Sequence, residues 1–337
     1  MTNPASAEDD LIARYFAPIA GAGGLGLRDD AALLKPPEGC ELVLTVDTAV
    51  AGVHFFANDP PASIARKVLR VNLSDLAAKG ADPAGFLLSF AMPADRNAPE
   101  RTEEWLAAFS HAMADDAERF NCPLLGGDTV TTPGPLTLSV TAFGTVPVGR
   151  MAKRTGARAG DIIFVSGTIG DAALGLQALL NSGDASWNAM DVKDRDYLIG
   201  RYREPQPRNC LAQAVRECAN GSMDVSDGLA GDLAKMMRVS GVSARIRIVD
   251  VPLSPAARRV TGVNPVLLDT ALTGGDDYEI LCTVSPRAAN AFRIAAAKAG
   301  VPVTAIGEVV SKQEQDAVFV EENGTVRVFQ RGSYSHF

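Results

Sequence analysis

The chain has 337 residues, of which 47% are hydrophobic and 21% are charged, a balance typical of a folded globular protein. Its formal net charge of −8 argues against nucleic-acid binding, which needs a basic surface to displace counterions. The charge leaves nucleotide substrates open, because metal ions can neutralise phosphates. At roughly 100–200 residues per domain, the length indicates two domains or one large domain.

The cysteines and the N-terminal residues indicate a cytoplasmic protein. Five cysteines form no CxxC pair, which favours reduced thiols. The first ten residues, MTNPASAEDD, are acidic where a secretory signal would be basic. No apolar run approaches the roughly 18 residues of a transmembrane helix, so we expect no membrane association.

Helices and strands alternate in the first half of the chain. The expected helices are 10–20, 61–81 and 99–120, and the expected strands are 41–49, 85–93, 124–130 and 136–146. Residues 21–26 match GxGxxG, but a helix rather than a strand precedes them. We therefore interpret them as a turn and not as a dinucleotide site.

A basic, glycine-containing connection, 147–156, predicts the domain boundary, with domains at 1–148 and 149–337. A second series of elements follows, and 181–207 is expected to be a mobile polar insertion. The fold class is α/β, with two α/β domains. The elements expected in the second domain are strands at 161–167, 244–253 and within 273–285, and helices at 171–180, 208–218 and 287–300.

Aspartates recur where apolar strands end or where helices begin. A single aspartate of this kind is more often an N-cap than a ligand. Several of them converging without cations would repel one another, whereas Mg²⁺ takes oxygen ligands and bridges carboxylates to phosphates. The pattern therefore favours a metal-dependent polyphosphate site. These aspartates are Asp29, Asp30, Asp47, Asp75, Asp128, Asp224, Asp227, Asp276 and Asp277.

Other motifs are less specific. No GxxxxGK[ST] or GxSxG sequence is present. The turn Gly167–Gly170 offers either an anion site or a tight connection into a helix. His54 is equally consistent with a substrate contact and with an ordinary loop histidine. Asp232 is expected only to interact with a helix dipole, at about a few tenths of a kcal/mol.

Eight motifs occur in an order that resembles the thiamine-monophosphate kinases, within the aminoimidazole-ribonucleotide synthetase-like superfamily of ATP-dependent enzymes. The resemblance runs from about Leu11 to the C-terminus. It implies ATP-dependent phosphorylation of thiamine monophosphate, Mg²⁺, a mixed N-terminal sheet that pairs in a barrel-like homodimer interface, a C-terminal α/β sandwich, and an active site between the domains. The motifs are LRDDAALL, TVDTAVAGVHF, VNLSDLAAKGADP, LLGGDTV, KRTGARAGD, DVSDGLAGDL, TGGDDYEIL and SYSHF.

The resemblance also implies roles for individual residues. Asp227 and Arg154 would be catalytic. ATP would be held by Gly127, Asp128, Arg154 and Ser226, and thiamine monophosphate by His54, Asp276 and Tyr334. The Mg²⁺ ligands would be Asp30, Thr45, Val46 (through its carbonyl), Asp47, Asp75, Asp128, Asp224 and Asp227.

Three positions depart from the family pattern. Arg28 replaces a usual glycine, Val46 replaces a common threonine, and Asp276 replaces a frequent glutamate. We expect direct in-line transfer without a strong general base, because the acceptor is already an ionised phosphate. The alternatives are another ATP-dependent synthetase of the same superfamily, or a non-enzymatic nucleotide or thiamine sensor.

Overall fold

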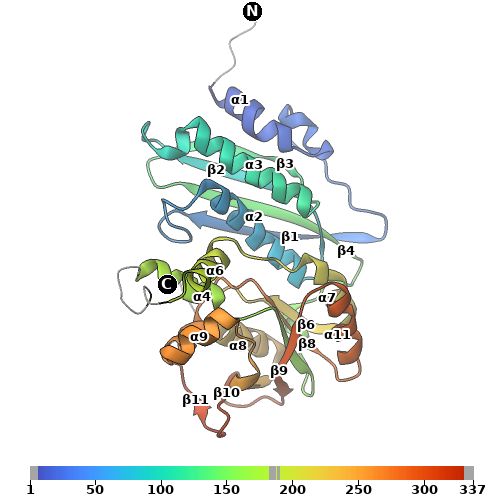
Figure 1. Ribbon diagram of the computed structural model, residues 1–337. Helices are drawn as coiled ribbons and strands as arrows, with labels where there is room; N and C mark the ends of the chain where they lie inside the picture. The colour runs from blue at the N-terminus through green and yellow to red at the C-terminus, as the bar shows by residue number, and fades with distance from the viewer. Residues whose placement is uncertain (1–6, 182–186, 188–189, 330–337) are drawn as a thin grey trace, which may run out of the picture. The chain divides into compact units, whose positions relative to one another are not determined.

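The computed structural model describes residues 7–181, 187 and 190–329, which form two compact units (Figure 1). The first unit comprises residues 1–76 and 82–149, and the second comprises 77–81 and 150–337. The chain passes between the units after residues 76, 81 and 149, and the last of these points lies within the basic connection 147–156.

The first elements of the N-terminal unit are short helical turns. Helix α1 covers Ala7–Leu11, a π-helical turn covers Ile12–Phe16, and a 3₁₀ turn covers Ala17–Ile19. The expected continuous α-helix over 10–20 is therefore wrong. Pro18 lacks an N–H group, so α-helical hydrogen bonding cannot continue through it, and it lies in the 3₁₀ turn.

A mixed four-stranded sheet forms the body of this unit, in the order β1-β4-β2-β3 (Figure 1). β1 and β2 are antiparallel to β4, whereas β2 and β3 are parallel. The mixed sheet agrees with the expected fold class. The elements are β1 (Cys40–Val50), α2 (Pro61–Ala78), β2 (Asp82–Pro93), α3 (Glu103–Arg119), β3 (Leu124–Thr132) and β4 (Thr137–Pro147).

Helices α2 and α3 pack on one face of this sheet (Figure 1). The Thr102 side chain caps α3 by accepting a hydrogen bond from the Trp105 N–H, 3.2 Å away. On α3, Trp105 stacks on Phe109, and both rings contact Phe90 of β2. This aromatic cluster fixes α3 on the sheet and places Trp105 in the core.

The opposite face of the sheet carries exposed apolar side chains on β1. Val43 is only 6% exposed, whereas Leu44 and Val46, one and three positions further along the strand, are 59% and 61% exposed. Because side chains alternate along a strand, these two project from the face opposite to Val43. Large apolar groups gathered on one sheet face favour an interaction surface.

The C-terminal unit contains a seven-stranded sheet in the order β11-β10-β7-β9-β5-β8-β6. Its neighbouring strands are antiparallel except for the parallel pair β10 and β7. The strands are β5 (Ile162–Ser166), β6 (Ala219–Asp224), β7 (Ser243–Arg247), β8 (Ile280–Val284), β9 (Val303–Val310), β10 (Ala317–Val320) and β11 (Val326–Arg327).

Helices cover both faces of the seven-stranded sheet, which agrees with the expected α/β sandwich. One core cluster packs α8 against Ile163 and Val165 of β5, and another packs α7 and α11 against Phe164. The alternation of β5 side chains thus serves two cores. The helices of this unit are α4 (Asp171–Leu180), α6 (Val192–Arg203), α7 (Ala212–Cys218), α8 (Leu229–Ser240), α9 (Pro255–Val263), α10 (Leu267–Thr273) and α11 (Ala289–Lys298).

The polar segment 181–207 differs from expectation, because part of it is the packed helix α6. Leu198 of α6 is fully buried, and its carbonyl lies so near α4 that a Cβ on Gly175 would be 2.0 Å from it. No helix was predicted where α9 and α10 lie, although Ser254 and Pro255 form a helix-start signal before α9, and the strand expected over 244–253 ends at Arg247. None of the helices in the described part of the chain has the length and apolar character needed to span a bilayer.

Candidate active site

A cavity of about 870 Å³ lies in the N-terminal unit, lined by residues of β2, β3 and β4 and by the segment before β1. It brings Asp30, Gly127 and Asp128 together, three of the predicted site residues. Asp128 stands beside Ser89 in the β2–β3 register, so both project from the same face. Gly127 has to be glycine, since a Cβ there would lie 1.9 Å from the Leu88 carbonyl oxygen.

A second acidic group lies where β1 passes α2. The Thr45 hydroxyl donates a short hydrogen bond to the Asp75 carboxylate. Asp47 is two residues further along β1 and therefore projects from the same face as Thr45. Val46 projects from the other face, so its carbonyl and not its side chain is the group that a metal ion would use.

The loop after β1 holds His54 in one tautomer. The Val50 backbone N–H donates to His54 Nδ1 at 3.0 Å, and the backbone N–H of His54 donates to the Val50 carbonyl. Since Nδ1 accepts, Nε2 carries the proton of the neutral ring. His54 is therefore fixed at the end of the strand that carries Thr45 and Asp47.

The donors in these two groups suit a hard cation. They are oxygen atoms of carboxylates, a hydroxyl and a backbone carbonyl, which Mg²⁺ prefers. Within residues 7–181, 187 and 190–329, no three His, Cys, Asp or Glu side chains lie close enough to enclose a metal ion by themselves. Mg²⁺ in proteins commonly keeps several waters and takes one or two carboxylates together with substrate phosphates.

In the C-terminal unit, Asp224 is the last residue of β6, and the loop between β6 and α8 carries Ser226 and Asp227. Asp232 of α8 is 1% exposed, and its Oδ2 accepts hydrogen bonds from the Ser226 N–H at 3.0 Å and the Asp227 N–H at 2.8 Å. Asp232 does lie in the first turn of α8. A helix-dipole contact alone nevertheless understates the role of Asp232, because this buried carboxylate accepts two hydrogen bonds that hold the loop.

The TGGDDYEIL motif, residues 273–281, is hydrogen-bonded to this loop. The Asp276 N–H donates to the Ser226 carbonyl at 2.9 Å, and the Tyr278 N–H donates to the Val225 carbonyl at 2.8 Å. Gly275 approaches so closely that a Cβ on it would lie 2.2 Å from the Ser226 oxygen. Asp276, with φ of 73°, has the left-handed backbone conformation that non-glycine residues adopt rarely. The structure thus brings Ser226, Asp227 and Asp276 together.

Asp277, the neighbour of Asp276, has a structural role. It is 1% exposed and accepts hydrogen bonds from the Gly170 N–H at 2.6 Å and the Ala172 N–H at 3.3 Å. Burial raises the pKa of Asp277 well above its usual value, against the opposing effect of these two donors. Its carboxylate therefore occupies the α4 N-terminus, and the tight-turn interpretation of Gly167–Gly170 is the better one.

Glu279 holds the segment that carries Asp276 and Asp277 through hydrogen bonds of its carboxylate. Arg208 Nε donates to it at 2.7 Å and Arg201 Nη2 donates at 3.0 Å. The Ser166 hydroxyl on β5 donates to Glu279 Oε2 at 2.6 Å, the oxygen that also accepts from Arg208 Nε. With Asp277 and Glu279 both fixed, the loop that presents Asp276 has little freedom to move.

Arg154 lies in a short 3₁₀ turn, Arg154–Gly156, and is exposed. Its carbonyl accepts a hydrogen bond from Ser240 Oγ at 3.2 Å, and the carbonyl of Lys153 accepts one from the Ser222 N–H at 3.0 Å. These bonds tie the turn to α8 and β6, the two elements that flank the Asp224–Asp227 loop. Tyr334 lies outside the described residues.

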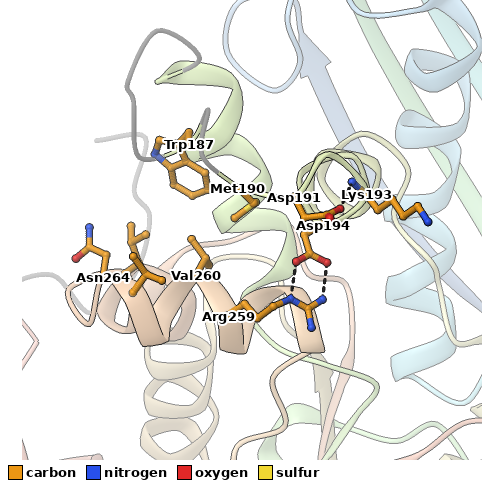
Figure 2. A pocket seen from close by; sticks show the side chains of 10 residues that line it. Trp187, Met190, Asp191, Lys193, Asp194, Arg259, Val260 and Asn264 are labelled. Carbon is orange, nitrogen blue, oxygen red and sulfur yellow. Dashed lines mark hydrogen bonds and ion pairs between the residues drawn. The ribbon is translucent and has the colours of Figure 1, made fainter.

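Another cavity, of about 530 Å³, lies between the start of α6 and α9 (Figure 2). Its wall is mainly apolar and includes Trp187 and Val260. Figure 2 shows its central polar pair, in which two nitrogens of Arg259 donate to Asp194 at 2.5 Å each. Asp191 also lines this cavity and caps α6. Because these groups are paired, and none is a predicted site residue, this cavity does not resemble a catalytic centre.

Sequence reasoning missed the residues that support the site. Asp232 and Lys235 are three positions apart on α8 and both contact the Asp227 loop. Their i, i+3 spacing was the available signal. Glu279 and its two arginines, by contrast, are joined only by the tertiary fold.

Comparison with known proteins gives the family. The model "AIR synthase related protein, N-terminal domain" matches residues 28–146, and the corresponding C-terminal domain model matches 158–320. Thiamine-monophosphate kinase of Escherichia coli K12 is 41% identical and covers 99% of both chains. That of Caulobacter vibrioides is 43% identical over 93% of this chain and 86% of its own length.

Solved structures agree. A thiamine-monophosphate kinase from Stenotrophomonas maltophilia has a TM-score of 0.79 at 38% identity, covering 89% of this chain and 91% of its own. A structure described as AaThiL complexed with AMPPCP and TMP has a TM-score of 0.76 at 29% identity, covering 92% and 91%. The chain therefore belongs to the thiamine-monophosphate kinase family of AIR synthase-related proteins.

Proposed function

We propose that the protein transfers the terminal phosphate of ATP to thiamine monophosphate and so forms thiamine diphosphate. The observation that carries the proposal is the 41% identity, over 99% of the chain, to a thiamine-monophosphate kinase. The AaThiL complex supports the choice of substrates, because it contains AMPPCP and TMP. The oxygen-rich groups in both units supply the chemistry that such a reaction needs.

The acidic side chains are the proposed Mg²⁺ ligands. In the first unit these are Asp30, Asp47, Asp75 and Asp128, with the Thr45 hydroxyl and the Val46 carbonyl as further oxygen donors. In the second unit they are Asp224 and Asp227. Bound Mg²⁺ would neutralise charge on the phosphates of both substrates. The fixed backbone around Gly127 and around Ser226 would orient ATP.

The remaining roles follow from side-chain type. Arg154 would stabilise charge on the transferred group. His54 and Asp276 would contact thiamine monophosphate, together with Tyr334. The acceptor is a phosphate oxygen that is largely ionised near pH 7, so in-line transfer needs positioning more than a strong base. This accounts for a site built from carboxylates without a catalytic cysteine.

A homodimer is part of the proposal. Leu44 and Val46 expose apolar area on the face of the N-terminal sheet that the helices leave uncovered, and a second copy of that face would cover them. Replacing Leu44 with glutamate should shift the mass measured by light scattering from dimer to monomer. We also propose the cytoplasm as the location, since all five cysteines are free thiols.

The test is Mg²⁺-dependent release of ADP from ATP by the purified protein, with and without thiamine monophosphate. Release that requires thiamine monophosphate supports the proposal, and Asp227→Asn should abolish it. Asp250→Asn is the matched control, because Asp250 forms an ion pair with Arg247 and is not a proposed site residue. Binding of both substrates without ADP release would indicate a sensor, and turnover of an aminoimidazole precursor would indicate another synthetase.

A further inference from the structure

Lys235 of α8 lies at the proposed metal-binding loop. Its ammonium nitrogen is 2.5 Å from Asp227 Oδ2 and 3.1 Å from Asp232 Oδ1. One positive charge therefore bridges two carboxylates that would otherwise repel each other. One of these carboxylates supports the loop, and the other is a proposed Mg²⁺ ligand.

The two carboxylates differ in how firmly they are held. The Asp232 side chain is 1% exposed and is fixed by two backbone N–H groups, whereas the Asp227 side chain is 39% exposed. The Lys235 side chain is 35% exposed, and its four-carbon stem is flexible. The ammonium can thus leave Asp227 for solvent while its bond to Asp232 persists.

We propose that Lys235 is a built-in counter-ion for Asp227, which Mg²⁺ must displace in order to bind. The inference rests on the proposed function, which makes Asp227 a metal ligand. The ammonium occupies one of the two Asp227 carboxylate oxygens, and it repels a dication that approaches this carboxylate. Lys235 therefore lowers the affinity of metal binding at Asp227 and balances the charge of this loop when no metal is bound.

The test is binding of Mn²⁺ to the full chain without nucleotide, followed by the electron paramagnetic resonance signal of free Mn²⁺. Asp227→Asn defines which part of the binding depends on Asp227. In Lys235→Gln, whose amide can still donate to Asp232, this part should tighten about 3- to 10-fold, a modest electrostatic coupling. Lys235→Arg keeps the charge and should bind no more tightly than the wild type.

Lys312→Gln is the matched control and should leave Mn²⁺ affinity unchanged, since Lys312 pairs with Asp316, away from the loop. Lys235→Met is a second neutral variant, in case the glutamine variant does not fold. If Mn²⁺ binding were unchanged or weaker in the neutral variants while Asp227→Asn clearly reduced it, the proposed role of Lys235 would be wrong. Asp227 would still be a metal ligand. If Asp227→Asn had no effect on binding, Asp227 would not be a ligand, and the metal assignment of the proposed function would fail.

Discussion

Replacing Asp232 with alanine perturbs the loop that carries Ser226 and Asp227. The carboxylate is 1% exposed, and its removal leaves two backbone N–H groups without their acceptor. Each unsatisfied group costs about 1–3 kcal/mol when buried, and Ser226 and Asp227 are only half-buried. The loss is partly offset, because burial of Asp232 itself is unfavourable and raises its pKa. We expect a decrease of about 2–4 kcal/mol in the free energy of unfolding.

Chemical denaturation with urea, followed by circular dichroism, measures this decrease. Asp232→Asn keeps one acceptor oxygen and should cost about 1 kcal/mol. Asp250→Ala removes only a surface ion pair and should cost less than about 1 kcal/mol. A loss of only a few tenths of a kcal/mol for Asp232→Ala would equal a simple helix-dipole contact, and would show that the two backbone hydrogen bonds do not support the loop.

Three further predictions use other contacts in the structure. Gly275→Ala should lower both stability and turnover, because its Cβ would lie 2.2 Å from the Ser226 oxygen; Gly262→Ala, which meets nothing within 4 Å, is the control for thermal melting and kinetics. A thiol reagent at pH 8 should label exposed Cys210 in the native protein but not buried Cys122, whose pKa burial raises to about 12; mass spectrometry that found both labelled equally would contradict this. The pKa of Asp277 is higher in the folded than in the unfolded chain, so folding favours its neutral form. As pH rises above about 4 through the folded pKa, the wild type should therefore lose stability relative to Asp277→Asn. A constant difference in the free energy of unfolding between the two proteins from pH 4 to about 8 would refute this prediction.

Much of the architecture was predictable from the sequence because the elements have clear periodicity. The strands around Asp47 and Asp128 and the helix that carries Asp75 all lie where apolar patterns placed them. Helix α6 was missed because its sequence, VKDRDYLIGRYR, is largely polar, and it is stabilised by close packing on α4. Periodicity reports a buried face, and α6 has too narrow a buried face to show one.

The site was predictable only in part. Motif spacing identified residues such as Asp227 and Asp276, which the structure brings into one interlocked pair of loops. It did not separate Asp276 from Asp277, although one lies on the loop and the other is buried as a helix cap. That distinction depends on which N–H groups the tertiary fold places beside each carboxylate. Two neighbouring aspartates cannot be told apart in this way from the sequence.

The most direct test of the central claim follows the phosphate itself. ATP labelled at its terminal phosphate is supplied with Mg²⁺ and thiamine monophosphate, and the products are separated by chromatography. The account predicts that the label appears in thiamine diphosphate, one for each ADP formed, with none retained on the protein. Label that accumulates on the protein before thiamine monophosphate is added, or that appears only as inorganic phosphate, would contradict direct transfer between the two substrates.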